Sequence, residues 1–391
     1  MPCYLLGTIS ILVHHMRTLI AALLAFVTAA HAEDSGLLPG LVATPLLLPV
    51  SIAGNEVKLD SFVIRPDRQG RYPLVIMTGG TPSVASPKNL AGRSPIAFNR
   101  VAIAFAQRGY ATITIMRRGY GLSSGGFAEE LQQPCDYLPA VRNSGDDILA
   151  AITALRGEPW VEADHILLVG QSTGGLAVLA AAAANPSGVV GLLDFDGGRH
   201  SPSATGEPCG SDHLIDTVAA LGRTARVPAL WLYAENDRAY GPSLAQDMLR
   251  AYTAGGAPAR LELLAPFDTD GHDLVYNAPL ETWLPAVEPF LAELKLPTAP
   301  VITLPEPASL PPPADLSSLC QEGFANYLAY RNDAKAFATD ISGGVCGVGK
   351  GRTAPEALNN AMSECQSVVR GKPVCHIYAV GQHLWAMEPL P

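Results

Sequence analysis

The segment His165-Ile-Leu-Leu-Val-Gly-Gln-Ser-Thr-Gly-Gly175, which continues as an alanine-rich run to Ala184, decides the fold. An apolar stretch ends at Gly170, and Ser172 lies between Gly170 and Gly174. This order is typical of a strand, a sharp turn and a helix. The glycines prevent clashes between strand and helix, and the serine hydroxyl stands at a helix N-terminus that favours negative charge. The segment therefore predicts a nucleophilic serine.

A second Gly-x-Ser-x-Gly match, Gly121-Leu-Ser-Ser-Gly125, occurs earlier in the chain. Ser123 lies several residues beyond the end of its strand, inside a Gly/Ser cluster, and no helical pattern follows it. A five-residue motif is a hypothesis until its context agrees with it. The context predicts that Ser123 belongs to a loop and that Ser172 is the nucleophile.

Two further residues follow strands in the order that a serine hydrolase of this kind requires. In such sheets the chain order is serine, acid, histidine. Asp237 follows the apolar run 229–234, and His272 follows the run 260–264. The carboxyl ends of parallel strands lie at one sheet edge, so we expect Ser172, Asp237 and His272 to meet there. The serine needs this base, and the base needs the acid to orient it.

Two other acids compete with Asp237. Asp270 is only two residues from His272, too close in the chain to orient it across the sheet edge. Glu235 is nearer its strand and is expected to point into the structure. Asp237 is therefore the predicted acid.

The other histidines fit less well than His272. His165 precedes the nucleophile strand and points to the far end of the sheet, while His200 and His213 come before the acid. A surface-loop histidine without a role is the alternative interpretation of His272. Its order and position favour the base.

Negative charge on the substrate oxygen requires two preorganised N–H groups. The amide of Thr173, directly after the nucleophile, is one candidate. The other comes from the turn Thr78-Gly-Gly-Thr81, where we predict Gly80, with Thr81 as its neighbouring alternative. Glycines here also permit a tight turn, and the two roles are compatible.

Continuous apolar strands alternate with helical patterns along most of the chain. This alternation predicts a mostly parallel sheet with helices on both faces, an α/β fold. The expected strands are 57–64 (an edge strand), 73–78, 110–116, 165–169, 189–194, 229–234 and 260–264, and the clearest helices are 96–108, 143–156 and 243–254.

With these motifs in place, residues 55–295 resemble the α/β-hydrolase fold and, within it, the dienelactone-hydrolase-like branch of exported bacterial proteins. The resemblance is carried by Thr78-Gly-Gly, Arg118-Gly-Tyr-Gly-Leu-Ser, Gly170-Gln-Ser-Thr-Gly-Gly, Asn236-Asp and Asp270-Gly-His. Dienelactone hydrolases proper have a cysteine nucleophile, whereas this chain has Ser172. The resemblance therefore implies a serine esterase that needs no metal or organic cofactor.

The N-terminus predicts a signal peptide over residues 16–32. Met16-Arg17 opens a short positive region, residues 18–30 are apolar, and Ala30-His31-Ala32 is an A-x-A cleavage site. Residues 1–15 are interpreted as a mis-assigned start. A membrane anchor is the alternative, but the apolar run is short for a span, and no later run reaches transmembrane length. The predicted location is the periplasm or the exterior.

The cysteines support export. Cys3 is lost with the leader, and an even number of cysteines in an exported chain indicates disulfides. The simplest pairing joins Cys135 to Cys209 and leaves two bridges among the remaining four, whose pairing stays open: Cys320, Cys346, Cys365 and Cys375. No C-x-x-C pair occurs, and the spacing of cysteines and histidines suits no zinc site, so no metal is expected.

The chain divides at a proline-rich segment. Prolines crowd residues 297–315, so a linker is expected between an α/β-hydrolase domain over 33–296 and a small disulfide-containing α+β module over 316–391. In the module we expect a strand pair at 334–349, a helix at 354–369 and a strand at 375–380. The module is similar to small cysteine-containing modules of exported bacterial proteins.

Several residues near the expected site have two interpretations. Arg117 and Arg118 could hold a substrate carboxylate, but loop arginines more often bind a local acid or backbone carbonyls. Tyr240 could line the pocket. Trp231, inside a strand, is expected in the core.

These observations predict an exported serine hydrolase that acts on a small carboxylic ester. A formal charge of -10 argues against nucleic acid or an anionic membrane as a partner. The chain between residues 191 and 229 is too short for a large lid, so we expect an open cleft. The alternatives are a serine peptidase on the same fold and a non-catalytic cell-envelope binding protein with a vestigial triad.

Overall fold

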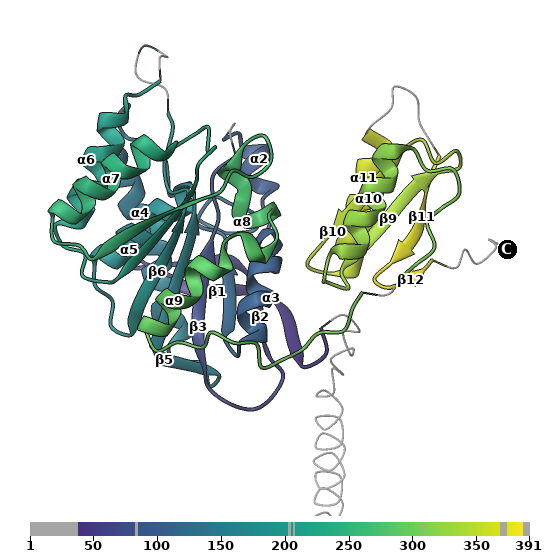
Figure 1. Ribbon diagram of the computed structural model, residues 1–391, viewed down its shortest axis with the longest axis horizontal. Coiled ribbons are helices and arrows are strands. Elements are labelled where there is room, and N and C mark those ends of the chain that lie inside the picture. Colours follow the sequence, from purple (N-terminus) through teal and green to yellow (C-terminus); the bar gives the residue numbers. More distant parts are fainter. Residues whose placement is uncertain are drawn as a thin grey trace, which may run out of the picture. The chain divides into compact units, whose positions relative to one another are not determined.

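The computed structural model describes residues 38–82, 85–201, 205, 208–307, 309–367 and 374–385 (Figure 1). The predicted signal peptide, residues 16–32, lies outside these residues. These residues contain a sheet of eight strands and a sheet of four strands. In the described part of the chain, no helix is both long enough and apolar enough to cross a membrane.

The larger sheet is mostly parallel, as predicted. Its strand order is β1-β2-β4-β3-β5-β6-β7-β8. β2 runs antiparallel to β1 and to β4, and the remaining neighbours are parallel. The strands are β1 (Leu41–Ile52), β2 (Asn55–Pro66), β3 (Tyr72–Thr78), β4 (Ala111–Ile115), β5 (Val161–Gln171), β6 (Val189–Phe195), β7 (Ala229–Ala234) and β8 (Ala259–Leu264).

Helices cover both faces of this sheet (Figure 1). Successive residues of a strand point to opposite faces, so the continuous apolar run of β5 fills two cores. Ile166 and Leu168 pack in one core, and Leu167 and Val169 pack in the other. The first core contains residues of α4 (Tyr137–Leu155), α5 (Thr173–Ala183), α6 (Ser211–Gly222) and α7 (Pro242–Ala254), and the second those of α3 (Asn99–Gln107), α8 (Leu274–Asn277) and α9 (Leu284–Glu293).

The prediction that residues 57–64 form an edge strand is wrong. They belong to β2, which pairs with β1 on one side and with β4 on the other. β1 was not expected because Pro45 and Pro49 lie inside it. Proline cannot donate to a sheet ladder, but an edge strand tolerates it because one of its sides has no neighbour. The prolines therefore mark the true edge of the sheet.

Two helices differ from the predicted limits. α4 begins at Tyr137 rather than at residue 143, with Pro139 in its first turn, where the missing N–H costs no helical hydrogen bond. The expected helix 96–108 divides into a 3-10 turn, η1 (Pro95–Phe98), and α3. Short helices α2 (Pro87–Ala91), η2 (Gly271–Asp273) and η3 (Leu280–Thr282) complete this part.

The four-stranded sheet lies in the C-terminal part of the chain and has the order β10-β9-β11-β12. Its expected strands and helix are present, and a further helix, α10, was missed. Ser317 caps the N-terminus of α10 by accepting a hydrogen bond from the amide of Cys320. The elements are α10 (Ser318–Ala329), β9 (Lys335–Asp340), β10 (Cys346–Lys350), α11 (Ala354–Ser367), β11 (Cys375–Val380) and β12 (His383–Leu384).

Two helices pack on this small sheet. Phe337 of β9 packs with α10, while its neighbours Ala336 and Ala338 pack with α11. α11 comes so close to β10 that a Cβ atom at Gly347 or Gly349 would overlap its backbone. Glycine in this strand therefore serves close packing.

All six expected cysteines are paired. Cys135 is bonded to Cys209, as predicted. The other four cysteines, whose pairing the sequence left undecided, form the disulfides Cys320–Cys346 and Cys365–Cys375. Cys320–Cys346 joins α10 to β10, and Cys365–Cys375 joins α11 to β11. Three disulfides suggest an oxidising, extracellular environment. The limits of the hydrolase domain, linker and module stay a prediction, and no helix or strand occurs between residues 297 and 317 among those described.

Candidate active site

Ser172 lies on a strained turn between β5 and α5. Its φ is 56° and its ψ is -124°, in a region that side chains other than glycine rarely adopt. A Cβ atom at Gly170 would overlap the carbonyl oxygen of Gly174, and one at Gly174 would overlap that of Thr78. Gly170 and Gly174 therefore let the strand and the helix meet at the angle that presents the hydroxyl of Ser172.

The structure brings the three predicted catalytic residues together. Nε2 of His272 lies 3.2 Å from Oγ of Ser172, and Nδ1 of His272 lies 3.1 Å from Oδ2 of Asp237. The three loops that carry them follow β5, β7 and β8, so the shared sheet edge was predicted correctly. This arrangement suits proton transfer from the serine through an oriented imidazole.

Asp237 is held as an ionised carboxylate. Its Oδ1 accepts hydrogen bonds from the amides of Ala239 and Tyr240, at 2.6 and 2.9 Å, which leaves Oδ2 for His272. Burial alone would raise the pKa of Asp237, but His272 and the two amides lower it below its usual value. The acid is therefore charged and fixed opposite the imidazole.

His272 is a stronger base than an ordinary histidine. Burial lowers its pKa, but the hydrogen bond to Asp237 and the charge of that carboxylate outweigh burial and raise the pKa above its usual value of 6.5. The edge of the His272 ring meets the Tyr240 ring, with centroids 5.3 Å apart. Tyr240 therefore lies beside the base.

The two competing acids have other positions. Oδ1 of Asp270 accepts the amides of His272 and Arg238, so Asp270 shapes the histidine loop and does not contact the imidazole nitrogens. The expectation that Glu235 points into the structure is wrong, because its side chain is exposed. β7 ends at Ala234, so Glu235 is already the first residue of the turn that follows the strand.

The two predicted oxyanion donors lie close to Ser172. Thr173 is the first residue of α5, where an amide has no acceptor within its own helix. A Cβ atom at Gly80 would lie 2.7 Å from Cβ of Ser172, so only glycine fits there. The amide of Gly80, however, donates to Oε1 of Gln171 at 3.1 Å.

Gln171 is a site residue that the sequence reasoning missed. Its Nε2 donates to the carbonyl oxygen of His272 at 3.0 Å, and its Oε1 also accepts the hydroxyl of Tyr276 at 3.1 Å. One buried amide therefore connects the turn of Ser172, the Gly80 segment and the histidine loop. Its place directly before the serine in the motif was the available signal.

The arginines of the Arg117-Arg118 pair bind local acids. Arg117 is buried, and its Nε donates to Oε1 of Glu129 at 2.8 Å. Nε of Arg118 donates to Oδ1 of Asp147 at 2.5 Å. Neither is a free ligand for a substrate carboxylate, and the local-acid interpretation is confirmed. Trp231 is fully buried, as predicted.

Ser123, of the second motif match, has a structural role. Its hydroxyl donates to the carbonyl oxygen of Met116 at 2.7 Å and accepts the amide of Asp60 at 2.8 Å. The serine therefore ties its loop to β2, and the prediction of a loop is confirmed.

No group of three or more metal-ligating side chains occurs among the residues that the structure describes.

Comparison with known proteins adds a family match. Residues 96–188, from within η1 to the residue before β6, match the model of the prolyl oligopeptidase family. The matched segment contains the turn of Ser172 and spans less than half of the chain. A search of curated proteins found no match to this chain.

Several solved structures resemble this chain over part of its length. Est1E from Butyrivibrio proteoclasticus, with ferulic acid bound, is 19% identical, with a TM-score of 0.44, and the match covers 63% of this chain and 98% of Est1E. A Klebsiella pneumoniae protein classified provisionally as a dienelactone hydrolase is 17% identical, with a TM-score of 0.45 and coverages of 65% and 98%. The acylaminoacyl peptidase of Pyrococcus horikoshii is 15% identical, with a TM-score of 0.46, and the match covers 68% of this chain but 43% of the peptidase.

The larger sheet has the α/β-hydrolase fold. Its mostly parallel strands, the helices on both of its faces and the serine turn between β5 and α5 are the features that the sequence analysis predicted. This fold hosts both esterases and peptidases, so the reaction has to be argued from the site.

Proposed function

We propose that this protein is a secreted or periplasmic serine hydrolase that cleaves carboxylic esters. The observation that carries the proposal is the chain of contacts from Ser172 through His272 to Asp237, at 3.2 and 3.1 Å. Asp237 is ionised and His272 has a raised pKa, which are the properties that an acid and a base need in these roles.

In the proposed reaction, Oγ of Ser172 attacks the ester carbonyl while Nε2 of His272 takes the hydroxyl proton. The tetrahedral intermediate collapses, the alcohol leaves with the proton from Nε2, and the acyl group stays on Ser172. Water then gives a proton to Nε2 and attacks the acyl carbonyl. The acid departs, the proton returns to Oγ, and Asp237 stabilises the imidazolium in each half-reaction.

The proposed donors to the oxyanion are the amides of Thr173 and Gly80. The Thr173 amide is at the helix N-terminus, where the helix dipole also favours negative charge. The Gly80 amide is shared with Gln171, so a substrate oxygen has to compete with, or displace, that side chain.

A panel of p-nitrophenyl esters of graded acyl length tests this function, with Ser172→Ala as the control. We expect hydrolysis of short acyl esters by the natural protein and loss of at least about a thousandfold in the variant. No hydrolysis of any ester by the folded natural protein would refute the proposal.

A peptidase is the second candidate, because the match to the prolyl oligopeptidase family covers the turn of Ser172. Aminoacyl and Xaa-Pro p-nitroanilides, assayed beside the esters, separate the two functions. Cleavage of an anilide with a larger kcat/KM than the best ester would favour the peptidase. If the protein is instead a non-catalytic cell-envelope binding protein, we expect hydrolysis of neither the esters nor the anilides.

A further inference from the structure

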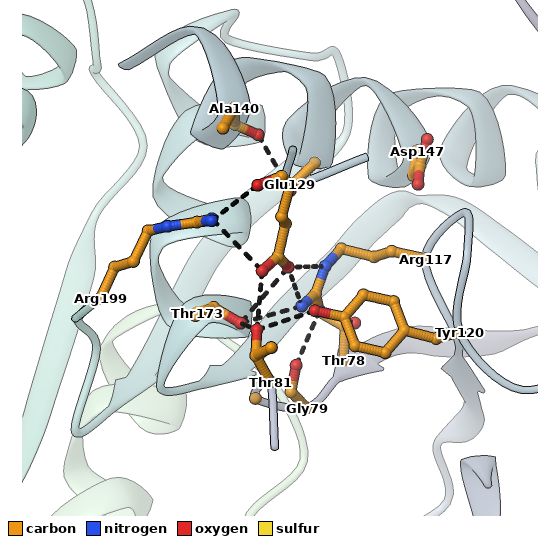
Figure 2. Close-up of polar contacts among 12 residues, drawn as sticks. Thr78, Gly79, Thr81, Arg117, Tyr120, Glu129, Ala140, Asp147, Thr173 and Arg199 are labelled. Atoms are coloured by element: carbon orange, nitrogen blue, oxygen red, sulfur yellow. Dashed lines mark hydrogen bonds and ion pairs between the residues drawn. The ribbon is translucent and has the colours of Figure 1, made fainter. Parts of the chain in front are cut away.

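A buried carboxylate lies close to the turn of Ser172 but outside the proposed triad. Glu129 comes from an irregular segment between β4 and α4, yet its side chain is only 1% exposed. Such a burial is costly unless partners neutralise and hydrogen-bond the carboxylate. Figure 2 shows the partners gathered around it. We call Thr81, Arg117, Glu129, Thr173 and Arg199 the Glu129 cluster.

Two arginines hold the carboxylate. Nε of Arg117 donates to Oε1 at 2.8 Å, and its Nη2 donates a hydrogen bond to the same oxygen. Arg199 lies 3.4 Å from Oε2 with its Nη1, and its Nη2 donates to the backbone oxygen of Glu129 at 2.6 Å. Burial raises the pKa of Glu129, but the two guanidinium groups and the Thr81 hydroxyl outweigh it and lower the pKa. The carboxylate is therefore charged.

The same groups reach both segments that we expect to bind the oxyanion. On one side, Oγ1 of Thr81, the residue after Gly80, donates to Oε2 of Glu129 at 2.7 Å. Arg117 donates from Nη1 to Oγ1 of Thr78 at 2.6 Å and to the backbone oxygen of Gly79 at 2.7 Å. The turn that carries Gly80 is thus held on both sides of that residue.

On the other side lies Thr173, the residue after Ser172. Nη2 of Arg117 donates to its Oγ1 at 3.0 Å, and the hydroxyls of Thr173 and Thr81 are 2.8 Å apart. The two segments come from β3 and from the β5–α5 turn, far apart in sequence. Within the described residues they are joined through a closed set of side-chain hydrogen bonds (Figure 2).

The charge of Glu129 fixes the direction of these bonds. A carboxylate only accepts, and a hydroxyl has one proton to donate. Because Thr81 gives its proton to Glu129, its oxygen accepts the hydroxyl proton of Tyr120, at 2.7 Å, and faces the hydroxyl of Thr173 as an acceptor. The Thr173 hydroxyl also lies within 3.3 Å of Oε1 of Glu129, so both acceptors available to its proton belong to the Glu129 cluster. Arg117 then donates to Thr173 and to Glu129, which closes the set. An amide in place of the carboxylate would turn one acceptor into a donor facing another donor.

We propose that Glu129 is a positioning residue for the proposed hydrolysis. Together with Arg117 it locks the Gly80 turn to Thr173 and so fixes the spacing of the two amides that meet the oxyanion. Glu129 touches no reacting atom. The inference rests on the proposed function, because it concerns the same site and the same transition state.

Glu129→Gln tests the role with little change of volume, on a short ester that the natural protein hydrolyses. A loosened oxyanion site lowers the transition-state affinity and leaves ground-state binding almost unchanged. We expect kcat to fall about ten- to a hundredfold, KM to change less than about twofold, and the Ki of an arylboronic acid to rise by a factor similar to the fall in kcat.

Asp147→Asn is the matched control. Asp147 of α4 is also buried, and it forms an ion pair with Arg118, the residue after Arg117. Figure 2 shows Asp147 apart from the Glu129 cluster. The control loses a buried ion pair and stability, but its kcat and Ki are expected to stay within about twofold of the natural protein.

A second pair of variants covers the case in which Glu129→Gln does not fold. Thr173→Val removes one hydroxyl and no charge, and Thr173→Ser keeps that hydroxyl. We expect kcat to fall about tenfold in the valine variant and to return in the serine variant. A folded Glu129→Gln or Thr173→Val protein with unchanged kcat and Ki overturns the inference. Absence of activity in the natural protein refutes the proposed function instead.

Discussion

The side-chain oxygen of Gln171 accepts a hydrogen bond from the amide of Gly80, over 3.1 Å. This amide is one of the two that we expect to meet the substrate oxygen. The nitrogen of the same side-chain amide, Nε2 of Gln171, donates to the carbonyl oxygen of His272 at 3.0 Å. A single buried amide thus contacts the proposed oxyanion segment and the loop of the proposed base.

We predict that Gln171→Met lowers kcat about tenfold, because both segments lose the group that fixes them. The variant keeps the side-chain volume but loses all three hydrogen bonds. Ester hydrolysis, measured as kcat and KM, is the test. Tyr276→Phe is the control, since it removes only the hydroxyl that donates to Gln171, and we expect kcat to change less than about threefold. Equal losses in the two variants would contradict this role.

The raised pKa of His272 sets the dependence of activity on pH. The base has to be neutral to accept the serine proton, so activity is low while the imidazolium is populated. We expect kcat/KM to increase with pH through a midpoint above 6.5, the usual histidine pKa. A pH profile on a neutral ester measures this directly. A midpoint below 6.5 would show that the carboxylate of Asp237 does not raise the pKa of the base.

Asp237→Asn removes the largest of the influences that raise the pKa of His272, so burial, which lowers that pKa, gains weight. We therefore expect the midpoint of the pH profile to move downward. The orientation of the imidazole is also lost, so kcat should fall about a thousandfold or more. Glu235→Gln, a change of an exposed acid in the same turn, should leave both quantities unaltered. A large effect of Glu235→Gln would favour the competing acid.

The disulfide between Cys135 and Cys209 closes a sequence separation of 74 residues, against 10 for Cys365–Cys375. In the chain-entropy account the longer loop gives the larger stabilisation, about 2–4 kcal/mol for typical bridges. We expect the double serine variant of Cys135 and Cys209 to lose more stability than that of Cys365 and Cys375. Urea unfolding of both variants measures it. The reverse order would contradict the entropic account here.

Asp194 gives a prediction about stability. It is buried in the core, and this burial raises its pKa to about 8. The folded state therefore holds a proton that the unfolded state has released above about pH 4, so this group's contribution declines as pH rises from there to about 8. Asp194→Asn removes that decline. Urea unfolding of both proteins, repeated at several pH values, measures this. As pH rises from about 4 to about 8, the free energy of unfolding of the variant should increase relative to that of the natural protein. A difference that stays constant over this range would contradict the prediction.

The parallel sheet and the meeting of Ser172, Asp237 and His272 could be predicted because their signals are local. An apolar run, a glycine turn and a polar residue after a strand each lie within a few residues, and parallel strands place those turns at one edge. The catalytic roles of the three residues stay a prediction until they are assayed.

Other features depend on partners that are distant in sequence. Glu129 looks like a surface acid in a loop, and nothing near it shows that Arg117 and Arg199 bury it. β1 was missed because Pro45 and Pro49 argue against a strand, although an edge position permits them. The hydrogen bond from Gly80 to Gln171 needs the two segments in three dimensions. The sequence could place the Gly80 turn beside the serine, but not state which acceptor its amide meets.

The most direct test of the account is covalent labelling by a fluorophosphonate, with the modified peptide identified by mass spectrometry. The account predicts a single adduct on Ser172, absent in Ser172→Ala and formed much more slowly in His272→Ala, because the base has to activate the hydroxyl. No adduct on the folded natural protein, or an adduct that persists in Ser172→Ala, would contradict the central claim that Ser172 is the nucleophile.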